Sequence, residues 1–469
     1  MSDLTTHLIT CQTPRPSTRL VGIERYPIAP LALWTFGTVD TVLTFPEELD
    51  VGRLKTAIGL LTSVWPTLGG RYERHQRSGE DGKFDFSFKL TSSSIPFSTQ
   101  SITSPTAYPF PNRVVIQNSL SPFLPPMGPR YSIPNSDEPL FVIRLTTILP
   151  FRSSVLGINM SHLIGDGECG LRLVEILEQF YLHGEAALSP ISNTLTNLLP
   201  TFGDHIALPP FQPEWDAIYS DWSVRGHDLK IRSETYARQQ EISEKTVIEF
   251  DQQEIKRLKD EWVGKTGEML SGQDVLSGWW VNLLERAGMK IDLVEYVLSH
   301  RHFCINHPSY PPDLPTLASN VSRVRTVPLP PHQPAGLTPG EIASLLRQAI
   351  LELRSNPDIT LPWLSSAAHH EQQAAIEEQG QILACGDGQV FINSNIKMNW
   401  HVTFGFEPHE TTYHTADTGL LYLRVFQANP QEGERLGNRV ELAFRLPKGG
   451  AKAAVADLTR RETQALIIE

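Results

Sequence analysis

The chain has 469 residues and a mass of 52.5 kDa, a length that predicts two or three domains rather than one. Hydrophobic residues make up 40% of the sequence and charged residues 20%, which excludes a disordered, collagen-like or disulfide-stapled chain. Because 52 acidic residues outnumber 40 Lys and Arg, the net charge is −12 and nucleic acid is not expected as a partner.

The first half of the chain predicts a helix, a long loop, two strands and a second helix. Apolar residues recur at helical spacing over 54–64, and recurrent prolines over 105–139 leave too few backbone donors for a continuous strand. The β-rich runs 141–149 and 154–160 predict two strands joined by a turn. Apolar residues on one face after Gly167 then predict a helix.

The second half of the chain predicts further strands and helices. Thr338 and Glu341 form a capping-box pattern with Pro339 at the first helical position, which predicts the start of a helix. The other elements are expected at 247–250, 252–262, 274–286, 389–394, 420–426 and 439–446. Because strands and helices follow one another without a regular βαβ rhythm, we expect an α/β fold of two sandwich-like lobes.

Composition shifts along the chain also suggest domain boundaries. We place an N-terminal lobe at 1–188, a proline-bearing crossover linker at 189–245 and a C-terminal lobe at 246–469. The four cysteines lie far apart in sequence, which is typical of free thiols in a reducing compartment. Neither a secretory signal nor a run of about 20 apolar residues is found. We therefore expect a cytoplasmic monomer without a membrane span.

One short segment carries the residues that suggest chemistry. Residues 161–167 follow a predicted strand and precede a predicted helix, which places His162 at a boundary between elements. A histidine there can act as a general base because its ordinary pKa of about 6.5 lies near the working pH. Asp166 can fix the loop, and Gly167 allows a close approach of another segment. On spacing alone, the alternative is a histidine buried at a strand end and an aspartate that caps the helix.

An overlapping segment suggests a nucleotide site. Residues 165–170 have the form G-x-G-x-x-G, which a dinucleotide site uses within a βαβ unit. The acidic residue needed about 20 residues further on falls at Glu185, which lies in a loop-like segment and not in a strand. The nucleotide interpretation therefore lacks its required context.

The pattern His162-x-x-x-Asp166-Gly167 resembles the signature of the BAHD acyltransferases, which transfer an acyl group from a coenzyme A thioester to an alcohol or amine. Other segments similar to this family's motifs follow in the same order, so the resemblance covers nearly the whole chain. These segments are 54–71, 139–141, 270–277, 311–315, 319–320 and 403–408. The chain looks more like fungal members from specialised metabolism than like plant members.

The resemblance implies a fold, a reaction and a set of site residues. The fold would be a two-lobed chloramphenicol-acetyltransferase-like α/β sandwich with mixed sheets and an interlobe tunnel. His162 would deprotonate the acceptor, and Asp166 would orient the loop. Acyl-coenzyme A, acetyl by default, would be a co-substrate beside a small-molecule acceptor, with no permanently bound cofactor. Candidate residues are Asn393, Ser394 and Asn395 for the oxyanion or substrate, and Ser271 and Gln273 for coenzyme A.

Two departures from the family pattern concern the C-terminal half. Thr403, Phe404 and Gly405 stand where the family has the start of its D-F-G-W-G motif, which is structural and remote from acyl transfer. Phe404 and Phe406 are expected to alternate along a strand and to pack in the core. Residues 393–395 replace a Ser-Trp pair, and a strand end whose side chains bind loop backbone is the alternative interpretation of this segment.

A third departure concerns the partner of Asp166. In the family, an arginine in a D-x-R pattern pairs with the motif aspartate, and that pattern is missing here from residues 304–307. Arg301 or His307 is therefore expected beside Asp166.

Two other functions stay open. A nonribosomal condensation domain shares the fold and would use a carrier-protein thioester, but Ser161 stands where that family has its first histidine. A noncatalytic ligand-binding relative is suggested by the altered segment 403–407. Lys256, Arg257 and Lys259 are expected to be a solvated helix face rather than a patch for the coenzyme phosphates. No metal site is expected, because no histidine pair has acidic or cysteine companions at ligand spacing.

Overall fold

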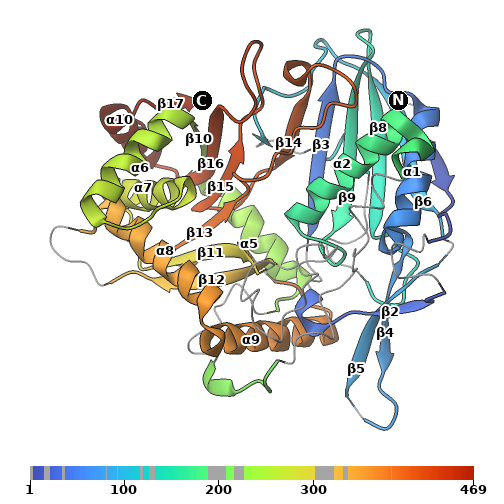
Figure 1. Cartoon of the computed structure of the whole chain (residues 1–469), viewed down its shortest axis with the longest axis horizontal. Coiled ribbons are helices and arrows are strands. Elements are labelled where there is room, and N and C mark those ends of the chain that lie inside the picture. The colour runs from blue at the N-terminus through green and yellow to red at the C-terminus, as the bar shows by residue number, and fades with distance from the viewer. Residues whose placement is uncertain are drawn as a thin grey trace.

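The chain forms two large sheets, each with helices packed against it, and a small third sheet (Figure 1). The computed structural model describes residues 4–14, 22–33, 37–80, 82–91, 93–116, 120–125, 133–188, 208–215, 226–300, 322–330, 336–381 and 383–468. Both large sheets combine parallel and antiparallel strand pairs. The expected fold class, a two-lobed α/β sandwich with mixed sheets, is confirmed.

The first sheet is built mainly from the first half of the chain. Its strands, in spatial order, are β1 (Thr5–Ile9), β6 (Ile95–Thr103), β8 (Phe141–Leu149), β9 (Ser153–Ser161), β3 (Thr38–Phe45), β14 (Thr412–Ala416) and β7 (Val115–Ile116). Helices α1 (Val51–Val64) and α2 (Gly167–His183) share one apolar core with β3, β8 and β9. On the opposite face, Val42 and Val155 pack against the segment that includes Leu120 and Phe123.

The second sheet belongs to the second half of the chain. Its strands, in spatial order, are β12 (Ser322–Pro328), β11 (Leu293–Ser299), β13 (Gln389–Ser394), β15 (Tyr422–Gln427), β16 (Arg439–Pro447), β10 (Ser243–Asp251) and β17 (Leu466–Ile468). The helices of this half are α5 (Leu229–Glu241), α6 (Gln252–Thr266), α7 (Gly272–Arg286), α8 (Pro339–Ser355), α9 (Pro357–Ile376) and α10 (Ala451–Glu462). Apolar residues of α6, α7 and α8 form a second core against this sheet.

The remaining elements are short. A small sheet contains β2 (Arg25–Pro27), β5 (Phe84–Lys89) and β4 (Arg71–Gln76) and projects from the N-terminal lobe in Figure 1. Turns of 3-10 helix are η2 (Pro30–Ala32), η3 (Pro66–Gly69), η4 (Gly184–Ala187), η5 (Pro213–Trp215) and η8 (Pro408–Glu410).

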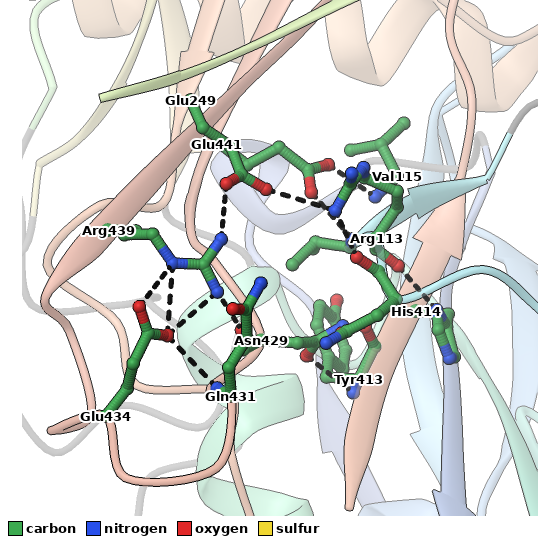
Figure 2. Close-up of polar contacts among 12 residues, drawn as sticks. Arg113, Val115, Glu249, Tyr413, His414, Asn429, Gln431, Glu434, Arg439 and Glu441 are labelled. Carbon is green, nitrogen blue, oxygen red and sulfur yellow. Dashed lines mark hydrogen bonds and ion pairs between the residues drawn. The ribbon is translucent and has the colours of Figure 1, made fainter. Parts of the chain in front are cut away.

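A strand exchange and a buried polar network join the two lobes. Strand β14 comes late in the sequence but pairs with β3 and β7 in the first sheet. Glu441 of β16 accepts hydrogen bonds from the backbone N–H groups of Val114 and Val115, each at 3.0 Å. Figure 2 shows Glu441 beside Val115. Glu249 of β10 pairs with Arg113 at 3.1 Å. Because these carboxylates of the second sheet hold a segment beside the first, the network ties one lobe to the other.

Most of the elements expected from the sequence are present. The segments 54–64, 141–149 and 154–160 correspond to α1, β8 and β9, and the capping box of Thr338 and Glu341 starts α8. The stretch expected to be a linker contains α5, and the three-part domain division stays a prediction. Among the described helices, none is long and apolar enough to cross a membrane.

Candidate active site

His162 lies in the loop that connects the end of β9 to the start of α2. Its backbone N–H donates to the carbonyl of Gly37 at 3.2 Å, which fixes the loop against the beginning of β3. The residue is partly exposed, whereas its Nδ1 atom is buried. Burial lowers the pKa of His162 to about 4 and the positive charge of Arg424 adds to this effect, while Asp166 and a hydrogen bond with the backbone of Gly165 oppose it. The imidazole is therefore neutral at pH 7 and able to accept a proton.

Asp166 ties the same loop to two different elements. Its carboxylate is 1% exposed and accepts a hydrogen bond from the backbone N–H of Cys169 at 3.2 Å, which caps α2. Its other oxygen accepts from the hydroxyl of Ser322 on β12, also at 3.2 Å. The two partners expected from the sequence, Arg301 and His307, lie outside the described residues. Asp166 thus links the histidine loop to the second sheet through a serine that the sequence analysis did not identify.

Gly167 allows the second lobe to approach the start of α2. A Cβ atom at this position would lie 3.2 Å from Oδ1 of Asn395 and 3.6 Å from the ring of Trp400. A side chain at this position would therefore require the Asn395 side chain to shift. The expectation that Gly167 permits a close approach agrees with this geometry.

Asn393 and Asn395 form a short polar chain that leads to the histidine loop. The Asn393 side chain donates to the hydroxyl of Tyr422 at 3.2 Å, and Asn395 donates to Asn393 at 3.5 Å. The backbone N–H of Asn395 donates to the carbonyl of Val425 at 2.8 Å, which extends the pairing of β13 with β15. Since Oδ1 of Asn395 lies 3.2 Å from the position of a Cβ atom on Gly167, this chain connects β15 with the start of α2.

Ser394 points to the opposite side of β13. Its hydroxyl donates to the side chain of Gln273 on α7, the helix that covers the other face of the second sheet. Gln273 in turn donates to Ser277 at 2.8 Å. Ser271 begins α7 and exchanges hydrogen bonds with Asp274 in a capping box. The structure therefore brings Asn393 and Asn395, but not Ser394, to the side of the sheet that faces His162.

The segment 403–405 lies at the far end of α2. The carboxylate of Glu178 accepts hydrogen bonds from the backbone N–H groups of Thr403 at 2.7 Å and Phe404 at 2.8 Å. Glu178 is 11 residues after the first residue of α2, which corresponds to about 16 Å along the helix axis. Thr403, Phe404 and Gly405 therefore hold the C-terminal half against the helix and lie far from His162.

The expectation that Phe404 and Phe406 alternate along a strand is wrong. Phe404 has a φ of 51° and Gly405 a φ of 97°, and this left-handed backbone belongs to a tight turn. The Phe404 ring packs against Phe45 at 5.1 Å and Tyr181 at 5.2 Å between ring centroids, so its burial in the core is confirmed. Two phenylalanines separated by one residue have the spacing expected on one face of a strand, but this spacing says nothing about the backbone between them.

The basic residues of α6 are engaged in local ion pairs. Arg257 lies 2.7 Å from Glu254 and 3.3 Å from Glu261, and Lys256 lies 3.0 Å from Asp260. These pairs are three or four residues apart on one helix, as on an ordinary solvated face. The interpretation as a solvated helix face is confirmed for Lys256 and Arg257, which are both exposed.

Comparison with solved structures relates the fold to known acyltransferases. F. graminearum TRI101 complexed with ethyl coenzyme A has a TM-score of 0.62 at 12% identity, covering 95% of this chain and 100% of that one. F. sporotrichioides TRI101 complexed with coenzyme A and T-2 has a TM-score of 0.59 at 13% identity, with 94% and 99% covered. Vinorine synthase has a TM-score of 0.58 at 14% identity, with 97% and 96% covered. No protein-family model and no curated protein sequence matches the chain. The likeness is thus one of fold, that of the BAHD acyltransferases.

Proposed function

We propose that the chain is an acyltransferase that moves an acyl group from a coenzyme A thioester to a hydroxyl or amine of a specialised metabolite. The observation that carries the proposal is the neutral, partly exposed imidazole of His162 in a loop held between two lobes. The fold is similar to that of acyltransferases whose structures contain coenzyme A, which supports the same co-substrate here. Acetyl is the donor group expected by default.

In the proposed reaction, the imidazole of His162 removes the proton from the acceptor as the acceptor oxygen or nitrogen attacks the thioester carbonyl. The tetrahedral oxyanion then collapses, the carbon–sulfur bond breaks, and the imidazolium returns its proton to the departing thiolate. General-base assistance of this kind contributes about 10²–10⁴-fold to the rate. Both substrates must be bound at once, so positioning supplies much of the remainder. No covalent acyl-enzyme is required.

The other candidate residues have supporting roles in this mechanism. Asp166 orients the loop, because its carboxylate is occupied by Cys169 and Ser322 and is not offered to a substrate proton. The side-chain amides of Asn393 and Asn395 are hydrogen-bond donors suited to the oxyanion. One such donor typically stabilises the transition state by about 2.7–4 kcal/mol. We propose that coenzyme A binds between the lobes, with no permanently bound cofactor. Gln273, which Ser394 contacts on the other face of the second sheet, and Ser271 at the start of the same helix are not assigned to it.

The test is a comparison of the natural chain with His162→Ala. The proteins are incubated with several acyl-coenzyme A donors and extracts of small molecules, and products are identified by mass spectrometry while free thiol is measured. We expect acylated products from the natural chain and at least about a hundred-fold lower turnover from His162→Ala. Near-normal turnover by the folded variant would refute the base assignment. Turnover with an acyl-carrier protein and not with acyl-coenzyme A would favour the condensation reaction, and binding without turnover would favour a noncatalytic relative.

A further inference from the structure

Arg424 of β15 is a partly buried cation without a carboxylate partner among the described residues. Three other arginines of the same sheet are each paired: Arg323 with Glu371 at 3.2 Å, Arg439 with Glu434 at 2.9 Å, and Arg445 with Asp417 at 2.6 Å. Charges taken out of water are ordinarily paired, because desolvation without a counter-ion is costly. The absence of a carboxylate beside Arg424 among the described residues therefore requires an explanation.

Neutral groups hold one edge of the Arg424 guanidinium in place. Nη1 donates to the carbonyl of Ala416 at 2.7 Å and to the hydroxyl of Thr415 at 3.3 Å. The group also lies over the ring of Phe426, with Cζ 4.8 Å from the ring centroid. Nε is buried and has no hydrogen-bond partner, and Nη2 makes no hydrogen bond to a described residue. Within the described part of the chain, the guanidinium thus keeps donors without partners and a charge without a counter-ion.

Arg424 faces the same side of the second sheet as the polar chain at the histidine loop. In the parallel pairing of β13 with β15, Arg424 stands opposite Asn393, so both side chains lie on one face. Asn393 accepts a hydrogen bond from Asn395, and Oδ1 of Asn395 lies close to Gly167. Arg424 and Asp166 both act electrostatically on His162, and Asp166 has Ser322 and Cys169 among its partners. The free guanidinium therefore belongs to the proposed reaction site.

We propose that Arg424 binds a carboxylate of one of the two substrates, so that the enzyme either acylates an acidic acceptor or transfers an acyl group that ends in a carboxylate. The phosphates of coenzyme A do not fit this position, because the pantetheine arm separates them from the thioester that His162 must reach. A planar carboxylate matches the two-donor edge of an arginine. This inference deepens the proposed function and rests on it for the identity of the ligand as a substrate.

The carboxylate would also strengthen the base. Arg424 disfavours the imidazolium form of His162 through its positive charge. A bound carboxylate would cancel that charge, and the pKa of His162 would rise in the complex. The pH dependence of kcat reports the pKa of His162 in the complex, and that of kcat/KM reports its pKa in the free enzyme. The fall of kcat in acid should therefore begin at higher pH than the fall of kcat/KM.

The first test detects the carboxylate site without turnover. The full chain is labelled with ¹⁵N-arginine, and the Nε–H signal of Arg424 is assigned from its loss in Arg424→Lys. Acetate is then added at constant ionic strength, with acetamide as the neutral isostere and chloride as the control anion. We expect a saturable shift of this one signal with acetate only. An unchanged signal, an equal shift with acetamide, or parallel shifts of the exposed arginine signals would overturn the proposal.

The second test identifies the source of the carboxylate. In the donor arm, succinyl-coenzyme A is compared with butyryl-coenzyme A, and in the acceptor arm, acids are compared with their methyl esters using acetyl-coenzyme A. We expect about a ten- to hundred-fold higher kcat/KM for the carboxylate member in one arm. The preference should be lost in Arg424→Gln, partly kept in Arg424→Lys and unchanged in Arg460→Gln, a surface control.

The outcomes separate this inference from the proposed function. If neither arm showed a preference for the carboxylate member, acetate would be an adventitious ion only. The proposed role of Arg424 in binding a substrate carboxylate would then be overturned. If Arg424→Gln raised KM equally for every coenzyme A thioester, Arg424 would bind a phosphate of the coenzyme. That result would also overturn the proposed carboxylate site. An acetate shift without any acyl transfer would count against the proposed function and leave the carboxylate site standing.

Discussion

The acid limb of the pH–rate profile should lie far below the usual range of a histidine. Burial lowers the pKa of His162 to about 4, and the Arg424 guanidinium adds to this shift. Lowering the pH from about 7 to about 5.5 should therefore leave the base deprotonated and kcat/KM almost unchanged, since this parameter follows the protonation of the free enzyme.

The magnitude follows from the two pKa values. At about pH 5.5, about 97% of the imidazole is neutral if its pKa is about 4, but only about 9% if it keeps the ordinary value of about 6.5. The predicted loss in kcat/KM over this interval is thus a few per cent, against about a ten-fold loss for an unperturbed histidine.

The assay measures initial rates of thiol release from acetyl-coenzyme A with a dithiodipyridine reagent, which reacts in weak acid. Circular dichroism at each pH verifies that the protein is folded. Asp166→Asn is the informative variant, because the carboxylate raises the pKa of His162 and asparagine still caps a helix. Its acid limb should move to lower pH, with kcat at neutral pH reduced only moderately.

A midpoint near 6.5 in the natural chain would refute the reasoning, because it would mean that the catalytic base is solvated as in a free peptide. An acid limb that does not move in Asp166→Asn would show that the carboxylate does not act on the imidazole.

Three further predictions address other parts of the molecule. Glu178→Ala should lower the free energy of unfolding by about 1–3 kcal/mol, because two backbone N–H groups of the 403–404 turn lose their acceptor. Thermal denaturation measures this loss, and steady-state kinetics should show an unchanged KM for acyl-coenzyme A. Gly167→Ala should destabilise the protein by about 1–3 kcal/mol and reduce kcat/KM, since its Cβ would meet Asn395 at 3.2 Å. Stability should fall as the pH drops from about 6.5 toward about 4, because burial lowers the pKa of His162 and His414 to about 4 and the unfolded chain takes up these protons first; urea denaturation at several pH values gives the slope.

Each of these predictions has a control. Glu178→Gln keeps one acceptor oxygen and should lose less stability than Glu178→Ala, and equal losses would contradict the assigned role. Adding Asn395→Ala to Gly167→Ala should recover part of the lost stability if the clash is with that side chain. In the variant with both His162→Gln and His414→Gln, the slope of stability between about pH 6.5 and 4 should flatten, and an unchanged slope would place the titrating groups elsewhere.

Local signals in the sequence were sufficient for the elements and for the central loop. Hydrophobic periodicity located α1 and α2, and a capping box located the start of α8, because these features depend on residues within one or two turns. The position of His162 between a strand and a helix was also predicted from local signals, and in the structure β9 ends at Ser161 and α2 begins at Gly167.

The partners of the site residues depended on contacts between distant segments. Asp166 and Ser322 are 156 residues apart, and their contact requires the edge strand β12 to reach the histidine loop. Arg424 comes opposite Asn393 only through the parallel register of β13 and β15, and β14 joins the first sheet from the second half of the chain. Periodicity states which face of an element is apolar but not which element it meets. The sequence by itself therefore determined part of the secondary structure, the two-lobed class and the histidine loop. Only the tertiary structure decided which charged and polar groups surround that loop, because strand register and lobe packing depend on interactions that no short window of sequence contains.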